Sequence, residues 1–413
     1  MLNTFSWSHF KPALNFTVLV ASLGYFVDMY DLVLYGIVRI PSLKSMGFSG
    51  EALVTEGVFL LNMQMTGMLI GGIIWGILGD KKGRLSVLFG SIALYSVSNI
   101  ANAFVTSLDG YAIARFFAGV GLAGELGAAI TLVGEIMKRE SRGYGTTIVA
   151  SVGIMGSVAA GVVGDIFSWQ TAYIIGGVLG LTLLALRAKM LESGMYKSLQ
   201  GMKGIKRGDF LSLFTNKTRF LKYLRCILIG LPMWFVVGIL IILSPEFAVH
   251  LGITGKVTAG NSIMFSYAGL VIGDLVSGFS SQIFRSRKRI VFIFLMIVSV
   301  LIVVYLNAFR ISAGLFYLLC FVMGVGIGYW AVFVTIASEQ FGTNLRSTVT
   351  TTVPNFVRGA VVIITLSFKA LKGNFGLIGA AYIVGFITII LALISLYYME
   401  ETYHKDLDFF END

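Results

Sequence analysis

The chain has 413 residues, of which 56% are hydrophobic and only 13% are charged, and its formal net charge is +10. Soluble domains carry about 25% charged residues, which cover their surface. This composition excludes a soluble globular enzyme, a disordered protein and a nucleic-acid-binding protein. Two cysteines in apolar runs and three scattered histidines exclude a disulfide framework and a zinc-type cluster. We therefore expect a membrane protein with no metal site and no cofactor.

Apolar runs long enough to form membrane-spanning helices, about 20 residues each, follow one another along the whole chain. Their length and their lack of strict alternation predict helices rather than strands. The twelve expected spans are 14–40, 57–78, 85–106, 110–137, 146–167, 170–191, 221–247, 257–283, 290–308, 312–337, 347–369 and 375–398.

The connections between these spans are short except for 192–220, which is polar and rich in Gly and Lys. This stretch lies at the midpoint of the chain, where a linker between two halves is expected. The prediction is an all-α membrane protein with an N-terminal six-helix bundle (1–191), a cytoplasmic linker (192–220) and a C-terminal six-helix bundle (221–413).

The basic residues gather on one side of the membrane. With the N-terminus in the cytoplasm, 23 of the 31 Lys and Arg residues fall on the cytoplasmic side and 6 on the other, while Arg115 and Arg358 lie inside spans. This bias sets the orientation by the positive-inside rule. Both termini are then cytoplasmic, and the net charge needs no nucleic-acid partner.

The two halves of the chain carry an internal repeat. The segment 115–121 (RFFAGVG) is matched 205 residues later by 320–326 (CFVMGVG), and Glu135 is matched 204 residues later by Glu339. A parallel duplication of six spans predicts a substrate site at the interface of the halves, near the bilayer midplane.

Several motifs resemble those of a known family. The run Gly79-Asp80-Lys81-Lys82-Gly83-Arg84 resembles the signature loop of the major facilitator superfamily. Segments resembling the sugar-porter and metabolite:proton-symporter branches are 115–124, 135–143, 192–196 and 401–407. The first span, with Asp28-Met29-Tyr30-Asp31, is similar to that of metabolite:proton symporters. The second copy of the signature loop departs from the pattern, with Gln282 where an Asp is usual. The resemblance covers the whole chain and implies a secondary active transporter with two pseudo-symmetric six-helix bundles.

Ionisable residues inside spans are costly and mark function. Asp28, Asp31 and Tyr35 share one helical face, and two close carboxylates raise the proton affinity of at least one of them. In the resembling branch, the residues matching Asp31 and Arg115 form the proton-coupling pair; the alternative is a purely structural ion pair. Glu125 is a candidate second proton or substrate site, or a hydrogen-bonding partner of a neighbouring helix.

Arg358 lies in the middle of the eleventh span, with no acid within one helical turn. It is a candidate ligand for a substrate carboxylate or phosphate, which its planar fork suits; the alternative is a pair with an acid on another helix. Weaker candidates for substrate contact, each of which could instead serve packing, are Tyr25, Tyr35, Gln64, Trp234, Tyr267, Tyr329, Trp330 and Asn355.

Another set of charges lies at the cytoplasmic ends of spans: Asp80, Arg84, Glu135, Arg142, Glu192, Glu339 and Arg346. In the resembling branch, such residues form salt bridges between the halves that close the cytoplasmic side. We expect these residues to form a cytoplasmic gate, with a role in topology alone as the alternative.

The residues and the resemblance together favour import of a small hydrophilic metabolite with a proton, by alternating access. An organic acid or a zwitterion such as an amino acid is expected, because acids and Arg coexist inside the spans. A proton-coupled exporter of a siderophore or drug-like compound and a transporter of sugars or phosphorylated metabolites remain as alternatives. We expect a monomer in a bacterial inner membrane, with the substrate and the lipid bilayer as its partners.

Overall fold

The computed structural model describes residues 10–50, 52–138, 140–187 and 207–411. Within these ranges the chain forms helices and no strand, and a single isolated bridge joins Thr254 and Ser312. The helices of the first half are η1 (Lys11–Ala13), α2 (Phe16–Ser45), α3 (Ala52–Lys82), α4 (Arg84–Asn102), α5 (Leu108–Leu122), α6 (Glu125–Ile136), α7 (Arg142–Ile166) and α8 (Trp169–Leu186). Those of the second half are α10 (Ser212–Thr215), α11 (Lys217–Leu228), α12 (Leu231–Phe235), the π-helical η3 (Val236–Ile241), α13 (Ser244–His250), α14 (Ala259–Ile283), α15 (Arg287–Leu306), α16 (Ala313–Gly326), α17 (Trp330–Gln340) and α18 (Arg346–Tyr397).

The number of membrane crossings agrees with the sequence prediction. Eleven helical stretches are long and apolar enough to cross a membrane. The last of them, α18, has 52 residues and is interrupted at Gly376, where φ is 68°. Because glycine adopts positive φ without a Cβ clash, the chain turns there and α18 supplies two crossings. The described chain therefore contains the twelve predicted spans.

Three predicted spans are broken in the middle, which the apolar pattern did not indicate. The fourth span consists of α5 and α6, the seventh is divided among α11, α12, η3 and α13, and the tenth consists of α16 and α17. Glycines pack against the fourth and tenth spans just before the break. A Cβ on Gly71 would lie 2.5 Å from the carbonyl oxygen of Val120, and one on Gly273 would lie 2.3 Å from that of Val325. The same backbone contact thus recurs in both halves, as expected of a repeat.

Hydroxyl and amide side chains begin many of these helices. Ser107 accepts a hydrogen bond from the backbone of Gly110 at the start of α5, and Ser312 accepts one from Leu315 at the start of α16. Such N-caps satisfy backbone donors that the first helical turn leaves unpaired. These two caps are also 205 residues apart in the sequence, the spacing of the repeat.

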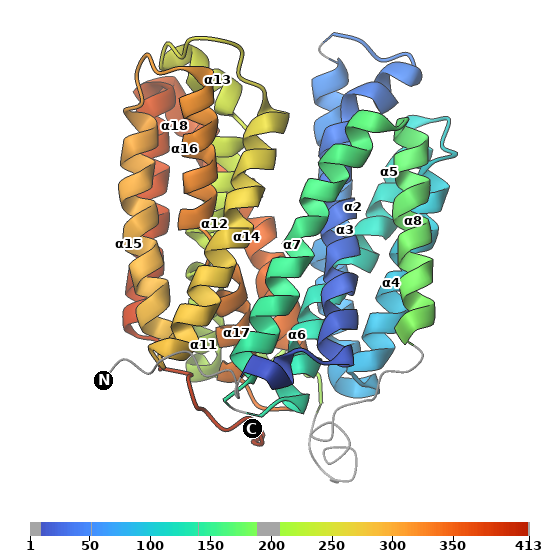
Figure 1. Cartoon of the computed structure of the whole chain (residues 1–413), viewed down its shortest axis with the longest axis vertical. Helices are drawn as coiled ribbons and strands as arrows, with labels where there is room; N and C mark the ends of the chain where they lie inside the picture. Colours follow the sequence, from blue (N-terminus) through green and yellow to red (C-terminus); the bar gives the residue numbers. More distant parts are fainter. Residues whose placement is uncertain (1–9, 51, 139, 188–206, 412–413) are drawn as a thin grey trace.

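The helices form two groups, α2 to α8 and α11 to α18, which lie side by side (Figure 1). The groups approach each other at the end where α6, α7, α11 and α17 lie (Figure 1). Close contacts join them there, since a Cβ on Gly278 would lie 2.0 Å from Thr147 and one on Gly76 would lie 2.9 Å from Thr348. Much of the predicted linker, 192–206, lies outside the described residues.

Candidate functional site

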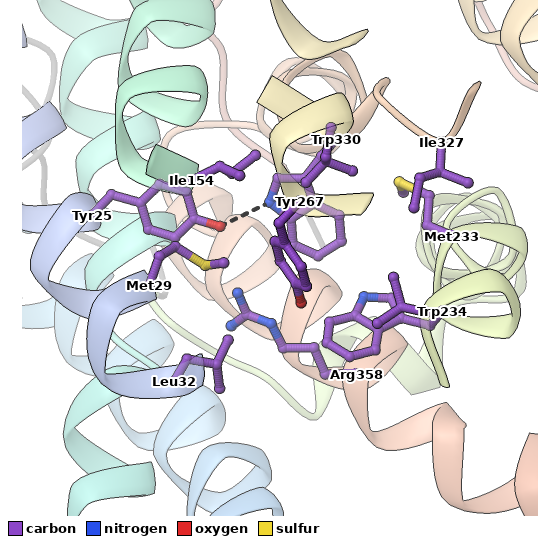
Figure 2. Close-up of a pocket in the computed structure, with 12 residues that line it drawn as sticks. Tyr25, Met29, Leu32, Ile154, Met233, Trp234, Tyr267, Ile327, Trp330 and Arg358 are labelled. Carbon is purple, nitrogen blue, oxygen red and sulfur yellow. Dashed lines mark hydrogen bonds between the residues drawn. The ribbon is translucent and has the colours of Figure 1, made fainter. Parts of the chain in front are cut away.

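A cavity lies between the two groups of helices (Figure 2). Its walls come from α2, α7, α12, η3, α14, α17, α18 and the break between α16 and α17, and they are formed by Tyr25, Met29, Leu32, Ile154, Met233, Trp234, Val237, Tyr267, Leu270, Ile327, Trp330 and Arg358. Five of the predicted substrate residues line it: Tyr25, Trp234, Tyr267, Trp330 and Arg358.

Arg358 extends across this cavity toward α2, so that its guanidinium ends near Met29 and Leu32 (Figure 2). Its Nη1 donates to Asn355 Oδ1 over 3.2 Å, and its Cζ lies 5.5 Å from the ring centroid of Trp330. Its Nε has no hydrogen-bonding partner among the described residues, and no described carboxylate lies within 4.0 Å. Since the side chain is buried, this cation lacks the direct ion pair that buried charges usually have.

Asn355 positions Arg358 rather than lining the cavity. Its Nδ2 donates to Ala123 in the other group of helices over 3.0 Å and to Thr351 over 2.8 Å. Its oxygen is thereby turned toward the guanidinium of Arg358.

Aromatic side chains form much of the cavity wall. Trp330 Nε1 donates to Tyr25 Oη over 3.1 Å, and the rings of Trp234 and Trp330 lie 6.5 Å apart (Figure 2). Tyr267 lies between them and above Arg358 (Figure 2). The combination of flat apolar faces and one guanidinium suits a planar anion.

Three predicted substrate residues lie elsewhere. Tyr35 donates to Gly57 over 2.8 Å, and Tyr329 donates to Ile229 over 2.9 Å. Gln64 is buried where α3 packs on α5, with its backbone against Gly119. These side chains bond or pack within one half and are absent from the cavity wall.

Asp31 and Arg115 lie together, as the resemblance implied. Asp31 Oδ1 is 3.6 Å from Arg115 Nη2, and both side chains are fully buried. Arg115 Nη2 donates to Asn99 Oδ1 over 2.8 Å, and its Cζ lies 4.9 Å from the ring centroid of Tyr173. The pair is thus electrostatic without a direct hydrogen bond, because neither oxygen of Asp31 accepts one from a described residue.

Asp28, one turn before Asp31, has no ion-pair partner within 4.0 Å and no hydrogen bond among the described residues. It is fully buried. Tyr25, Met29 and Leu32 of α2 line the cavity and lie on one face of that helix. Asp28 is the residue next to Met29, so it lies at the edge of this face.

Glu125 forms a buried ion pair with Arg187, at the C-terminal end of α8. Arg187 Nη1 donates to Glu125 Oε2 over 2.9 Å and to the carbonyl of Leu88 over 2.6 Å, while its Nη2 contacts Oε1. Arg187 is thus the partner of Glu125, which the sequence did not indicate. It directly follows an apolar run, so the sequence does not separate it from a basic residue of a loop.

Asp274 of α14 is a buried acid that the sequence reasoning missed. Its Oδ1 accepts a hydrogen bond from the backbone N–H of Ala331 over 3.0 Å, at the beginning of α17. Its Oδ2 has no partner among the described residues. An Asp in the middle of an apolar span was the available signal.

The predicted gate residues meet at the end of the molecule where the two groups approach. Glu135 Oε1 lies 2.7 Å from Arg84 Nη2 and 2.9 Å from Arg346 Nη1, so one carboxylate joins both halves. Asp80 accepts from the backbone N–H groups of Ser347 and Thr348, over 3.0 and 2.8 Å, at the beginning of α18. A carboxylate is favourable at a helix N-terminus.

A second cluster lies at the same end. Glu339 is 2.9 Å from Arg142 of the other half and 3.4 Å from Arg287. Arg142 also donates to the carbonyl of Lys405 over 2.9 Å, beyond the last helix. Glu192, the remaining predicted gate residue, lies outside the described residues.

Known proteins share this fold. Residues 1–366 match the model of the Major Facilitator Superfamily. Over 222 residues the chain is 29% identical to a Bacillus subtilis protein that carries the name of a niacin/nicotinamide transporter, and the match spans 53% of each chain. It is 24% identical over 410 residues to the gentisate transporter of Corynebacterium glutamicum, spanning 94% of this chain and 88% of that protein.

The solved structure of the proton:xylose symporter XylE bound to 6-bromo-6-deoxy-D-glucose has a TM-score of 0.77 at 16% identity, and the match covers 95% of this chain and 97% of XylE. The chain spans about half the length of the Bacillus relative and most of the length of the other two proteins. The family and these relatives are transporters, not enzymes. With the helices and the family match together, this multi-pass membrane protein belongs to the major facilitator superfamily.

Proposed function

We propose that this protein imports a small aromatic carboxylate together with a proton, by alternating access. The observation that carries the proposal is Arg358, a buried cation without a direct ion pair in an aromatic-walled cavity between the halves. A guanidinium binds a carboxylate through two parallel hydrogen bonds, and aromatic faces stack on a planar ring. The same cavity can therefore bind both the carboxylate and the aromatic ring of such a substrate.

The names of two relatives support this choice of substrate. Niacin and gentisate are carboxylic acids on aromatic rings, and proteins named for their transport match this chain. The composition of the wall also supports it, because Met29, Leu32 and Ile154 offer no hydrogen bonds to a sugar. The likeness to the xylose symporter, at 16% identity, concerns the fold alone.

Proton coupling would operate at Asp31 and Arg115. An ionised Asp31 attracts Arg115 across 3.6 Å, and a proton on Asp31 removes that attraction. Arg115 would then be held by Asn99 and the aromatic ring of Tyr173 alone. Protonation of Asp31 would in this way shift the equilibrium between the conformations of the transporter.

We also propose that the protein works as a monomer in a bacterial inner membrane, with both termini in the cytoplasm and the proton as its coupling ion. The distribution of Lys and Arg supports this orientation. The clusters around Glu135 and Glu339 would then close the cytoplasmic side in the conformation described.

Uptake into proteoliposomes under an imposed proton gradient tests the proposal. We expect labelled benzoate or nicotinate to accumulate when the outside is acidic, and xylose and alanine not to. Arg358→Gln should lower this uptake at least about tenfold, since it removes a charge-assisted bond. Lys369→Gln, on the exposed side of the same helix, is the matched control.

Other outcomes would point to the alternatives. Accumulation of xylose or alanine in place of the aromatic acids would contradict the substrate class. Substrate movement against the direction of the proton flow would indicate an exporter.

A further inference from the structure

The ionisable side chains around the cavity divide into pairs and a remainder. Asp31 pairs with Arg115, and Glu125 pairs with Arg187. Asp28 of α2, Asp274 of α14 and Arg358 of α18 are left without an ion pair among the described residues. Asp274 already accepts a hydrogen bond from the backbone of α17, whereas Asp28 accepts none and lies across the interface between the halves from Arg358. Both are buried, and isolated buried charges are costly.

The surroundings of Asp28 show which charge acts on it. Four charged groups surround it: Arg358 across the cavity, Glu125 of α6, Asp31 of its own helix and Arg187 after α8. Of the two cations, Arg187 is already bonded to Glu125, whereas Arg358 has no ion pair among the described residues. The buried hydroxyl-bearing side chains nearby are Tyr25 of the same helix and Tyr95 of α4.

The direction of Arg358 agrees with this reading. Its guanidinium points toward α2 and ends near Met29 and Leu32, the neighbours of Asp28 on that helix (Figure 2). Its Nε is unpartnered, and among the described residues the side chain that it hydrogen-bonds is the neutral amide of Asn355.

We infer that Asp28 is the counter-ion of Arg358 in the empty protein, and that the substrate carboxylate competes with Asp28 for this guanidinium. When the substrate anion binds Arg358, two carboxylates share one cation in a poorly solvated site, so Asp28 takes up a proton. One proton is thus bound for each carboxylate. The inference rests on the proposed function and deepens it, because it assigns substrate-linked proton binding to Asp28 and leaves Asp31 to its own partner, Arg115.

A measurement without substrate tests the pair itself. A double-mutant cycle of Asp28→Asn and Arg358→Gln is followed by the thermal stability of the purified protein. At about pH 8 we expect the two changes to be non-additive, and at about pH 5 the coupling should shrink as Asp28 is protonated. The control cycle of Asp31→Asn with Arg358→Gln should be additive, because Asp31 is held by Arg115.

Binding of benzoate to the same preparations tests the competition. Benzoate is ionised above about pH 5.5, so any pH dependence there belongs to the protein. The wild-type affinity should fall by up to about tenfold per pH unit once Asp28 ionises. Asp28→Asn should remove this slope and keep tight binding, while Asp28→Glu and Asp31→Asn should keep the slope.

The two measurements separate this inference from the proposed function. An additive Asp28–Arg358 cycle at about pH 8 overturns the inference, as does an unchanged slope of benzoate binding in Asp28→Asn. If the Asp28–Arg358 cycle is non-additive but the protein binds no aromatic acid, the ion pair is supported and the proposed substrate class is contradicted.

Discussion

Trp330 of α17 donates its indole N–H to the hydroxyl of Tyr25 of α2 over 3.1 Å, and this bond joins the two halves at the level of the cavity (Figure 2). The same indole lies 5.5 Å from the guanidinium carbon of Arg358. The cavity wall that would contact a substrate is therefore also a connection between the halves.

Tyr25→Phe removes this hydrogen bond and keeps the ring. A neutral hydrogen bond contributes about 1 kcal/mol, so the balance between conformations should shift about fivefold away from the one described. Distances between spin labels on the C-terminal ends of α6 and α17 would report the shift. Tyr267→Phe, which alters another hydroxyl of the same wall, should leave the distances unchanged.

Glu135→Gln should weaken closure of the end of the molecule where the two groups of helices approach each other (Figure 1). Glu135 holds Arg84 of its own half and Arg346 of the other, and all three side chains are buried. Breaking a buried ion pair costs about 3–5 kcal/mol, so the thermal stability should fall clearly. Glu400→Gln is the control, because its 3.9 Å pair with Lys405 is exposed and worth at most about 1 kcal/mol. Equal effects of the two changes would contradict the gate.

The buried pair of Glu125 and Arg187 makes a different prediction. Glu125→Gln leaves Arg187 charged and without its partner, so we expect a loss of about 3–5 kcal/mol in stability. The double variant Glu125→Leu with Arg187→Met should recover part of that loss, because both charges are gone. Proton-driven uptake by the double variant decides the role: retained uptake makes the pair structural, and lost uptake assigns it to proton coupling.

Periodicity and composition predicted most of the fold, because twelve crossings need only length and apolarity. They did not predict the breaks in the fourth and tenth spans, since Leu122 to Glu125 and Gly326 to Trp330 lie within continuous apolar patterns. Those breaks depend on glycine-mediated backbone contacts between helices, which arise only on folding.

The residues of the candidate site were likewise predictable from the sequence only in part. Asp31 could be paired with Arg115 because the resemblance assigns these two positions to each other. For Glu135 and Arg346 the resemblance implied only membership of one set of gate residues, and the structure joins them. Arg187 and Asp274 could not, because a basic residue after an apolar run and a single acid within one do not indicate a partner across helices. Tyr35 was placed at the site because it shares a helical face with Asp28 and Asp31, and Tyr329 because of its span, but their hydroxyls bond elsewhere.

Glu401 lies beyond the last membrane-spanning helix, and its carboxyl makes the stability of the fold depend on pH in the acid range. Burial acts to raise the pKa of its carboxyl, but hydrogen bonds from the Ser286 hydroxyl and from three backbone N–H groups outweigh burial and hold the pKa below its ordinary value. Because the folded pKa is the lower one, the stabilisation is present above the ordinary Glu pKa and is lost as the pH falls through the depressed value.

Thermal unfolding between about pH 6 and about pH 3 checks this sensitivity. Glu401→Gln should lower the melting temperature at about pH 6 and differ less from the wild type at the acid end. Glu400→Gln changes the neighbouring residue, whose side chain is 77% exposed, and should leave the curve in place. A Glu401→Gln curve parallel to that of the wild type would contradict the assignment.

Asp274 should stabilise the first turn of α17, because its carboxylate accepts a hydrogen bond from the Ala331 N–H. Asp274→Asn keeps an acceptor oxygen of the same shape, so stability should change little, whereas Asp274→Leu leaves the N–H unpaired and should cost about 0.5–2 kcal/mol. Since α17 begins with Trp330, the Leu variant should also weaken benzoate binding, and the Asn variant should retain it. Loss of proton-driven uptake in a stable, benzoate-binding Asn variant would show instead that Asp274 must ionise during the transport cycle.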